Sequence, residues 1–491
     1  MTGLFADLAV AALTGARWYA GKGRPVRLVG IAPLAWTAAP GDAALPAGLR
    51  GVRPVLVTVA HDDVDPPDID IYQFLVTFRP TGGQDDPAGA LGTCRDPDVT
   101  GSGEEVLVVD ATRDPEAMRV ALQALARAGG DRRDAPPSPP ARTGTVHDHL
   151  LFPLPQVDLT PHPFEGQQSN SSVFFGDHLV LKVFRRLGIG RNPDIAVHAA
   201  LSREAGVGVA RLYGWADAQW VDDGTELSAD LAMLVERFPG ARDGWDLAGS
   251  RCRAGEDFST EAAELGAALR RVHAGLAARF PTATEPASRV AAAMVARLER
   301  ACRMAPELAP YAPGLTDILT ASTDRQLPIQ HIHGDFHLGQ ALRVSDAQDG
   351  THWRIIDFEG EPMVPLAERW RPDSPWRDVA GLIRSIRYAS SAPAGDSDAP
   401  AREAWAHRAQ QAFLAAYCDG APDPDDLDVL RAYIVDKAVY EVVYEVRNRP
   451  AWAGIPLRAV AELAGSRGDR DFQLPSTRRD GPTPTGEENQ D

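Results

Sequence analysis

Short apolar runs of strand length mark the first half of the chain. Residues 52–60 and 71–80 are rich in β-branched and aromatic side chains and are bounded by Pro, Gly or Asp, as is typical of strands. Residues 171–186 hold two such runs on either side of a Gly-Asp pair, which predicts a tight β-hairpin. The run LAMLVERF at residues 231–238 ends at a Pro-Gly pair and predicts another strand. The first half is therefore expected to contain small β-sheets.

In the second half of the chain the apolar positions follow a helical period. Within residues 260–280 apolar side chains recur every three or four positions between Leu265 and Leu276, and residues 290–304 behave similarly. His273 lies on the apolar face of the first of these segments, where a histidine is expected to be a hydrogen-bonded core residue. We therefore predict a mainly helical unit after the β-rich part.

The chain is too long for one compact part. A sequence of 491 residues exceeds what a single hydrophobic core usually organises. The segment RRDAPPSPPAR is too rich in proline and charge to form a core element, and the final stretch is polar and lacks apolar periodicity. The predicted parts are an N-terminal module at residues 1–131, a linker at 132–142, a β-rich part at 143–238, a helical part at 239–470 and a disordered tail at 471–491.

Charge and composition exclude several classes of partner. The net charge of −18 opposes non-specific attraction to nucleic acid or to anionic lipid, so neither is expected as a partner. No apolar run approaches the roughly 18 residues that a membrane helix needs. The four cysteines form no CxxC pair, which favours reduced thiols over a zinc ribbon or a disulfide framework. The N-terminus lacks the basic start of a secretory signal, so we expect a cytoplasmic protein.

Two neighbouring segments carry the densest cluster of chemically active residues. They are QHIHGDFHLGQAL at residues 330–342 and RIIDFEGEP at residues 354–362. Phosphoryl transfer needs a carboxylate near the acceptor hydroxyl and oxygen ligands for a divalent metal ion. Asp335, Gln340 and Asp357 supply these groups in chain order, so the pattern predicts transfer of the γ-phosphate of ATP with Mg²⁺ as the metal.

The spacing within these segments is specific. Asp335 and Gln340 are five residues apart, as are the Asp and Asn of the HRDxxxxN loop in protein kinases. Asp357 follows two apolar residues, as does the metal-binding Asp of a DFG motif. Glu359 lies two positions further on, on the same side if the backbone is extended, and is a candidate second ligand. Mg²⁺ prefers such oxygen ligands.

A candidate sugar site lies near the C-terminal end of the helical part. Carboxylates and phenol rings recur there at spacings of three and four, which places them on one helix face. Carboxylates accept hydrogen bonds from sugar hydroxyls, and aromatic rings pack on the apolar face of a pyranose. The predicted substrate-binding residues are His337, Arg369, Arg377, Asp436, Tyr440, Glu441 and Tyr444.

Several residues admit a structural interpretation. The segment PDSPWRD at residues 372–378 could order the helical part through an internal ion pair of Arg377 or Asp378. His337 is expected to order its loop as a hydrogen-bond donor. Arg185 and Arg186 are expected to be solvated, because a charged pair at a strand end usually is.

Three alternative interpretations fit parts of the sequence. The alternating His331, His333, Asp335 and His337 could begin a dinuclear zinc site of a hydrolase, although the other histidines have no ligand-like setting. The segment GARWYAGKG resembles a phosphate-binding P-loop, but it lacks the required spacing and the Ser or Thr, so a structural role in the N-terminal module is favoured. A non-catalytic binding module of the same fold is the third alternative.

Taken together, the motifs resemble the bacterial maltokinases, relatives of the aminoglycoside phosphotransferases. The resemblance covers nearly the whole chain apart from the linker and the tail. It rests on RWYAGK, QSNSSVFF, VLKVFRR, NPDI, HGDFHLGQ, DFEGEP, PDSPWRDVAGLIRS and DKAVYEVVYEVRNRPAW. It implies an α+β, bilobal protein-kinase-like fold with an N-terminal cap domain, a small β-rich lobe and a large mainly helical lobe.

The resemblance also implies an activity. It implies transfer of phosphate from ATP to the anomeric hydroxyl of maltose, giving maltose 1-phosphate for α-glucan assembly, with trehalose synthase as a partner that supplies maltose. The alternative is a kinase of an amino sugar or another monosaccharide, similar to the glucosamine kinases. By the same resemblance, ATP lies in the cleft between the lobes.

Residues of the small lobe are assigned by the resemblance alone. The ATP-binding residues that it implies are Gln168, Ser169, Asn170 and Ser171 in a phosphate-covering loop, Lys182 as the phosphate-reaching lysine, and Glu236 and Phe238 at the hinge. The chain departs from the family at Ala196, where relatives often carry an acid. The ion-pair partner of Lys182 is therefore left open between Asp194 and Glu204.

Overall fold

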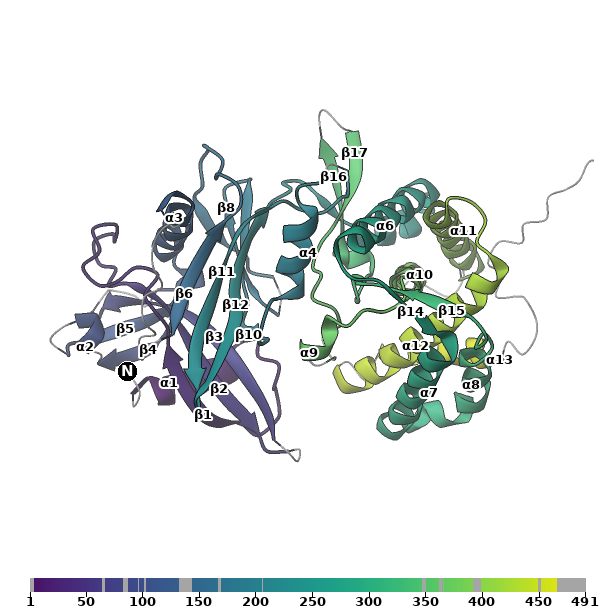
Figure 1. The fold of residues 1–491 in the computed structure, drawn as a ribbon, viewed down its shortest axis with the longest axis horizontal. Coiled ribbons are helices and arrows are strands. Elements are labelled where there is room, and N and C mark those ends of the chain that lie inside the picture. Colours follow the sequence, from purple (N-terminus) through teal and green to yellow (C-terminus); the bar gives the residue numbers. More distant parts are fainter. Residues whose placement is uncertain are drawn as a thin grey trace, which may run out of the picture. The chain divides into compact units, whose positions relative to one another are not determined.

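The fold was analysed in a computed structural model, which describes residues 4–63, 67–82, 87–95, 97–100, 103–131, 144–166, 169–204, 206–346, 350–361, 364, 366–391, 399–448 and 452–465. The predicted linker at 132–142 and the tail at 471–491 lie outside these ranges. The chain forms two compact units (Figure 1). Unit 1 comprises Met1–Ala205, Val209–Ala241 and Val364–Trp370, and unit 2 comprises Gly206–Gly208, Arg242–Met363 and Arg371–Asp491.

The first sheet of unit 1 is built from the N-terminal module. Its strand order is β1-β2-β3-β5-β4, with β10 also paired to β3. The strands are β1 (Arg27–Pro33), β2 (Val52–His61), β3 (Asp68–Pro80), β4 (Ala90–Arg95), β5 (Glu105–Asp110) and β10 (Arg186–Leu187). The predicted strands at 52–60 and 71–80 are confirmed as β2 and β3, which pair antiparallel. Both are largely buried. The helices α1 (Leu4–Gly15), α2 (Pro97–Thr100) and α3 (Pro115–Asp131) contribute to the cores that contain them, and Leu56 of β2 also packs with Leu231 and Met233, which lie in the second sheet.

The second sheet of unit 1 has the order β6-β11-β12-β9-β8-β7. Its strands are β6 (Thr145–Leu150), β7 (Pro161–Pro163), β8 (Ser171–Phe175), β9 (Leu179–Val183), β11 (Leu212–Asp222) and β12 (Thr225–Glu236). The predicted hairpin is confirmed as β8 and β9, whose three-residue connection begins at Gly176 with φ 53°. The helix α4 (Pro193–Leu201) follows β10, and the short α9 (Leu366–Arg369) also belongs to this unit.

Unit 2 is mainly helical, as the apolar period predicted. Its helices are α5 (Gly244–Ala254), α6 (Ser259–Arg279), α7 (Ala287–Met304), α8 (Ala312–Leu319), α10 (Trp376–Ser391), α11 (Ala399–Cys418), α12 (Pro424–Asn448) and α13 (Gly454–Gly465). Two small sheets complete it: β13 (Arg242–Asp243), β16 (Ala341–Asp346) and β17 (Gly350–Ile355) in one, and β14 (Ala283–Pro286) and β15 (Gln326–Ile329) in the other. The apolar face predicted on α6 is buried at Leu265, Leu269, Val272 and Leu276. None of the helices described is long and apolar enough to cross a membrane.

The prediction that Arg185 is solvated is wrong. Its side chain is 1% exposed, and the guanidinium donates to Asp110 Oδ2 at 2.6 Å and to Ser171 Oγ at 2.8 Å. The ring of Trp18 lies 4.9 Å below the guanidinium carbon. A carboxylate, a hydroxyl and an aromatic face thus replace the water that a charged strand end normally keeps. Its neighbour Arg186 remains one-third exposed in its ion pair with Asp70.

Candidate active site

The backbone of the loop that carries Asp335 is fixed by hydrogen bonds to one buried carboxylate. Asp378, at the start of α10, accepts hydrogen bonds from the backbone N–H groups of His333 at 2.7 Å and Gly334 at 2.9 Å. It also pairs with His273 Nε2 at 2.9 Å. Burial alone would raise the pKa of Asp378, but His273 and these donors hold it below its usual range. The predicted internal ion pair of the PDSPWRD segment is therefore present, and it fixes the backbone next to Asp335.

The carboxylate of Asp335 belongs to a buried group of three charges. Lys437, on α12, donates to Asp335 Oδ1 at 2.9 Å and to Glu361 Oε1 at 2.9 Å. The three side chains are between 8% and 15% exposed. Burial would raise the pKa of Asp335, but the ammonium group of Lys437 holds it below its usual value. The same carboxylates raise the pKa of Lys437 well above its ordinary range against the effect of burial. Asp335 is thus ionised at neutral pH, as a proton acceptor must be.

Lys437 and Glu361 were missed by the sequence analysis. Lys437 lies 102 residues from Asp335 and 76 from Glu361, so no local pattern joins them. One signal was available, because Lys437 precedes Tyr440 and Glu441 by three and four positions and so lies on the helix face predicted to bind sugar.

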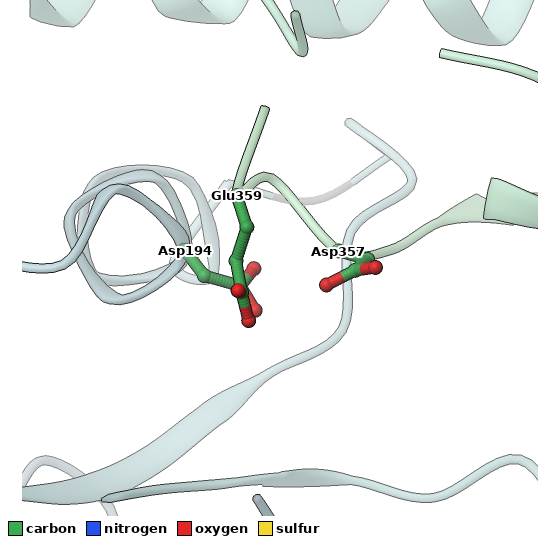
Figure 2. A group of neighbouring side chains, drawn as sticks. All are labelled: Asp194, Asp357 and Glu359. Carbon is green, nitrogen blue, oxygen red and sulfur yellow. The ribbon is translucent and has the colours of Figure 1, made fainter. Parts of the chain in front are cut away.

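Two of the predicted metal ligands, Asp357 and Glu359, lie on the loop after β17, and the third, Gln340, lies just before β16. Gln340 Nε2 donates to Asp357 Oδ2 at 3.1 Å, and the backbone N–H of Ile356 donates to Gln340 O at 3.0 Å. Asp357 and Glu359 come from the same loop (Figure 2), and a carboxylate oxygen of one lies within 4.8 Å of one of the other. An amide and two carboxylates are the oxygen donors that Mg²⁺ takes in proteins, so the residues fit that ion.

The backbone at Asp357 is not extended, contrary to the geometry assumed for Glu359. Asp357 has φ 68°, in the left-handed region that residues other than glycine rarely adopt. The turn at Asp357, rather than strand alternation, therefore brings Glu359 near it. Such a conformation costs roughly 1–3 kcal/mol and is concentrated at functional sites.

Lys182 has a defined partner within unit 1. Its Nζ lies 2.9 Å from Asp194 Oδ2, and the Asp194 side chain is 3% exposed. Figure 2 shows Asp194 on the first turn of α4, which is capped by the Asn192 side chain. Burial would raise the pKa of Asp194, but Lys182 and His198 hold it far below its usual range. Asp194, one of the two candidates from the sequence, thus makes this ion pair.

The segment predicted to cover the phosphates is anchored by Arg185. Asn170 Oδ1 accepts from the Arg185 backbone N–H at 3.2 Å, and Ser171 Oγ accepts from the guanidinium. Ser169 precedes them in a bend, and Gln168 lies outside the described residues. The side-chain oxygens of Asn170 and Ser171 are therefore engaged with protein.

The two predicted hinge residues lie at the end of β12, with Glu236 as its last residue and Phe238 two positions further on. The backbone N–H of Glu236 donates to Arg211 O at 2.9 Å, and Phe238 O accepts from the Ala241 N–H at 3.2 Å. These two backbone groups already have protein partners. A contact with adenine would therefore use other groups of the segment, and the hinge role stays a prediction.

The charged members of the predicted sugar site form internal ion pairs. Asp436 accepts from Arg297 at 2.8 and 2.9 Å and from Arg377 at 3.2 Å. Glu441 accepts from Arg384 Nη2 at 2.6 Å. Arg377 thus forms the internal ion pair that its structural interpretation predicted. A sugar-binding role of these residues stays a prediction.

The aromatic and remaining members of the predicted sugar site have other neighbours. The rings of Tyr440 and Tyr444 stack with centroids 6.3 Å apart, and Lys437 Nζ lies 4.7 Å from the Tyr440 ring centroid. Arg369 belongs to unit 1 and donates to Val364 O at 2.8 Å. His337 orders its loop, but as an acceptor, because its Nδ1 accepts from the Gly339 N–H at 3.1 Å. Burial lowers the pKa of His337, which keeps the ring neutral and leaves Nδ1 free to accept.

The zinc and P-loop alternatives gain no support from the geometry. His333 Nε2 donates to Ile356 O at 2.9 Å, and His337 Nδ1 is taken by Gly339. Within the described ranges, no cluster of three or more potential metal ligands includes a histidine. In the GARWYAGKG segment, Tyr19 is 4% exposed and Trp18 packs against Phe74, with ring centroids 5.3 Å apart, so the predicted structural role is confirmed.

Comparisons with known proteins identify sugar kinases as relatives of this chain. Residues 13–114 match the family described as the maltokinase N-terminal cap domain. A glucosamine kinase from Streptacidiphilus jiangxiensis is 31% identical over 385 residues, which cover 69% of this chain and 84% of that protein. A glucosamine kinase from Mycolicibacterium smegmatis is 27% identical over 349 residues, covering 64% of this chain and 82% of that protein.

Solved structures show the same fold. A glucosamine kinase in complex with glucosamine, ADP and inorganic phosphate superposes with a TM-score of 0.57 at 23% identity, covering 92% of this chain and 98% of that one. A second crystal form of a glucosamine kinase gives a TM-score of 0.55 at 24% identity, covering 89% and 94%. The predicted α+β, bilobal kinase-like fold with an N-terminal cap is confirmed. The chain therefore belongs to the family of sugar kinases that includes these glucosamine kinases, and its N-terminal part matches the maltokinase N-terminal cap domain.

Proposed function

We propose that the chain transfers the γ-phosphate of ATP to the anomeric hydroxyl of maltose, giving maltose 1-phosphate. The observation that carries the phosphotransfer part is the buried Asp335, kept ionised by Lys437 at 2.9 Å on a loop fixed by Asp378. An ionised carboxylate with an immobile backbone can orient an acceptor hydroxyl and take its proton. The match of residues 13–114 to the maltokinase cap supports maltose as the acceptor.

Each residue of the site has one task in this proposal. Asp335 accepts the proton of the sugar hydroxyl, and Lys437 keeps that carboxylate unprotonated until the acceptor binds. Asp357, Gln340 and Glu359 would hold Mg²⁺, which supplies neutralisation of the phosphate charge. In unit 1, Lys182 positions the phosphates of ATP, and Asp194 fixes the direction of its side chain.

A second acceptor is favoured by a separate observation. The curated relatives at 31% and 27% identity are glucosamine kinases, so glucosamine is the alternative substrate. The maltose proposal also implies a cytoplasmic enzyme whose product enters α-glucan assembly, with a trehalose synthase as the supplier of maltose.

A panel of sugars tests the acceptor. ADP release is measured with maltose, glucosamine and glucose at a fixed concentration of MgATP, and ³¹P NMR distinguishes an anomeric phosphate from a phosphate at another carbon. We expect release with maltose and an anomeric product. Brisk release with glucosamine and none with maltose would replace maltose by the amino sugar while leaving the kinase assignment in place.

A single substitution tests the base. Asp335→Asn removes the proton acceptor, and loss of a general base commonly costs about 10² to 10⁴ in rate. We expect kcat to fall by that order while binding of a fluorescent ATP analogue is retained. A variant with near-normal kcat would show that Asp335 is not the base.

A further inference from the structure

Asp230 is a buried carboxylate whose two oxygens both hold the beginning of α4. Its side chain, on β12, is only 3% exposed. Oδ2 accepts from the backbone N–H of Asn192 at 2.5 Å, and Oδ1 accepts from Arg191 Nη1 at 3.0 Å. Asn192 is the N-cap of α4, so Asp230 fixes the residue from which the helix starts. The helix carries Asp194 two residues later.

The strand that bears Asp230 also sets the position of Lys182. Met233 of β12 pairs directly with Lys182 of β9 in the antiparallel ladder. The backbone of β12 thus positions Lys182. The side chain of Asp230, three residues before Met233 on the same strand, positions the helix that carries Asp194. The backbone contact from Gly190 N to Ser228 O at 2.7 Å holds the preceding loop but does not reach the helix cap.

The surroundings of Asp230 keep it directed at α4. The Arg191 guanidinium carbon lies 4.7 Å from the centroid of Trp215, which also stacks on the His149 ring with centroids 4.5 Å apart. His149 in turn pairs with Asp217 at 2.6 Å, directly across the ladder from Asp230. Stacking of this kind restricts the guanidinium, so that Arg191 presents its donors to Asp230 in one orientation.

We propose that Asp230 is a positioning residue for the nucleotide: it fixes the start of α4 and thereby aims Asp194 at Lys182. It touches no reactant. This inference rests on the proposed role of Lys182 in holding the phosphates of ATP. It predicts that loss of Asp230 weakens use of ATP more than use of the sugar, because the sugar is handled by residues of unit 2.

The test is Asp230→Asn, with KM and kcat measured separately for ATP and for the sugar acceptor. We expect the KM for ATP to rise about tenfold, because small displacements of a positioning group have large effects on binding and rate. The KM for the sugar should change less than twofold.

Asp114→Asn is the matched control. Asp114 is also a buried carboxylate that accepts backbone N–H groups at a helix start, from Glu116 at 3.0 Å and Ala117 at 3.2 Å. It also pairs with an arginine, at 2.7 Å, but it serves α3 and does not contact the Lys182–Asp194 pair. We expect Asp114→Asn to lower the melting temperature as much as Asp230→Asn does while leaving the KM for ATP unchanged. Equal effects of both variants on the KM for ATP would show that Asp230 is only a structural residue and would overturn the inference. An Asp230→Asn variant with unchanged kinetic constants would overturn it as well.

Lys182→Met separates this inference from the function on which it rests. If Asp230 acts through Lys182, then Asp230→Asn should add little to the effect of Lys182→Met in the double variant. Additive effects on the KM for ATP would overturn the positioning role alone. An unchanged KM for ATP in the single Lys182→Met variant would instead overturn the proposed role of Lys182.

Discussion

The charge beside a catalytic carboxylate decides the pH range in which it works. Burial of Asp335 favours its neutral form, and Lys437, 2.9 Å away, reverses this preference. The folded-state pKa is below the usual one, so the carboxylate stays ionised until the pH falls well into the acid range. Under the proposed function, in which Asp335 is the base, Lys437 sets the acid limit of activity.

Lys437→Met should move the acid limb of the kcat/KM profile to higher pH. The reason is that burial would then act on Asp335 without an opposing ammonium group, so that its pKa rises. We expect kcat at pH 7 to fall roughly tenfold or more, as for loss of an electrostatic group beside a reacting centre. Lys437→Arg keeps the charge and should keep the limb in place. A limb that does not move in the Met variant would contradict this role.

Asp357→Asn should raise the Mg²⁺ concentration needed for half-maximal activity. Asn tolerates the positive φ of Asp357, so the loop should persist while one anionic ligand is lost. An increase of about 10-fold to 100-fold is the scale expected for a damaged metal site. Asp223→Asn is the control, because Asp223 also has positive φ, 44°, but lies in the exposed turn between β11 and β12. The same Mg²⁺ midpoint in both variants would exclude Asp357 as a ligand.

The sequence predicted those active-site residues whose spacing is local. Asp335, Gln340 and Asp357 were found because five and seventeen positions separate them in turn, within two adjacent segments. Lys437 and Arg185 were not, because their partners come from distant parts of the chain. A charged side chain in a sequence gives no sign of whether tertiary contacts will bury it.

At the scale of elements, α10 packs directly against the loop that carries Asp335. A Cβ at Gly381 would lie 2.4 Å from the backbone oxygen of Phe336, next in sequence to Asp335. Only glycine allows this approach of helix and loop. The same helix provides Asp378, so α10 both packs against the loop and accepts hydrogen bonds from its backbone.

Gly381→Ala should therefore lower both stability and kcat. Alanine favours a helix by about 1 kcal/mol over glycine, but the clash with rigid backbone should cost more, since overpacking typically costs about 1–3 kcal/mol. Thermal unfolding and kcat are measured together. Gly454→Ala is the control, because a Cβ there would meet no described atom within 4 Å. A stabilised Gly381→Ala with full kcat would show that the loop adapts freely.

Strands and helices were predicted best where one face is apolar. The hairpin β8–β9 and the helix α6 appeared close to their predicted bounds. The strand β12 begins at Thr225, six residues before the predicted start, because its first part is polar and is recognised as strand only through its pairing with β11. That polar half contains Asp230. The contact between Asp230 and α4 could therefore not be predicted from the pattern of apolar residues.

At the scale of the whole molecule, the free energy of unfolding should depend on pH through carboxylates whose pKa values are shifted in opposite directions. Arg377 holds the pKa of the partly buried Asp373 below its usual value, as Lys437 does for Asp335. The stabilising contribution of these carboxylates is therefore present above the ordinary carboxyl pKa of 3.8 and is lost as the pH falls. Burial instead raises the pKa of Asp230 to about 6, with Asp217 acting in the same direction and Asn192, Arg191 and His149 acting against it. Its contribution is present at low pH and is lost as the pH rises toward 6.

Asp230→Asn should consequently change the slope of stability between pH 4 and 7. The free energy of unfolding, measured by urea denaturation, should fall less with rising pH in the variant than in the parent, because the variant has no proton to lose there. Parallel curves over this range would show that Asp230 has an ordinary pKa.

The class of fold was accessible from sequence because patterns of different period occupy different halves of the chain. The boundaries of the compact units were not, because short segments that are distant in sequence join each unit: Gly206–Gly208 belongs to unit 2 and Val364–Trp370 to unit 1. Neither segment has a periodicity that assigns it.

This interleaving limits how the enzyme can be recombined with its relatives. The chain passes from one unit to the other at five points, so a hybrid with a single crossover joins pieces of both units from different parents. A chimaera meant to exchange only the catalytic unit with a glucosamine kinase must also exchange residues 206–208 and retain residues 364–370 of the recipient. Hybrids that ignore these two short segments should be recovered mostly as insoluble protein, whatever sugar their parents phosphorylate.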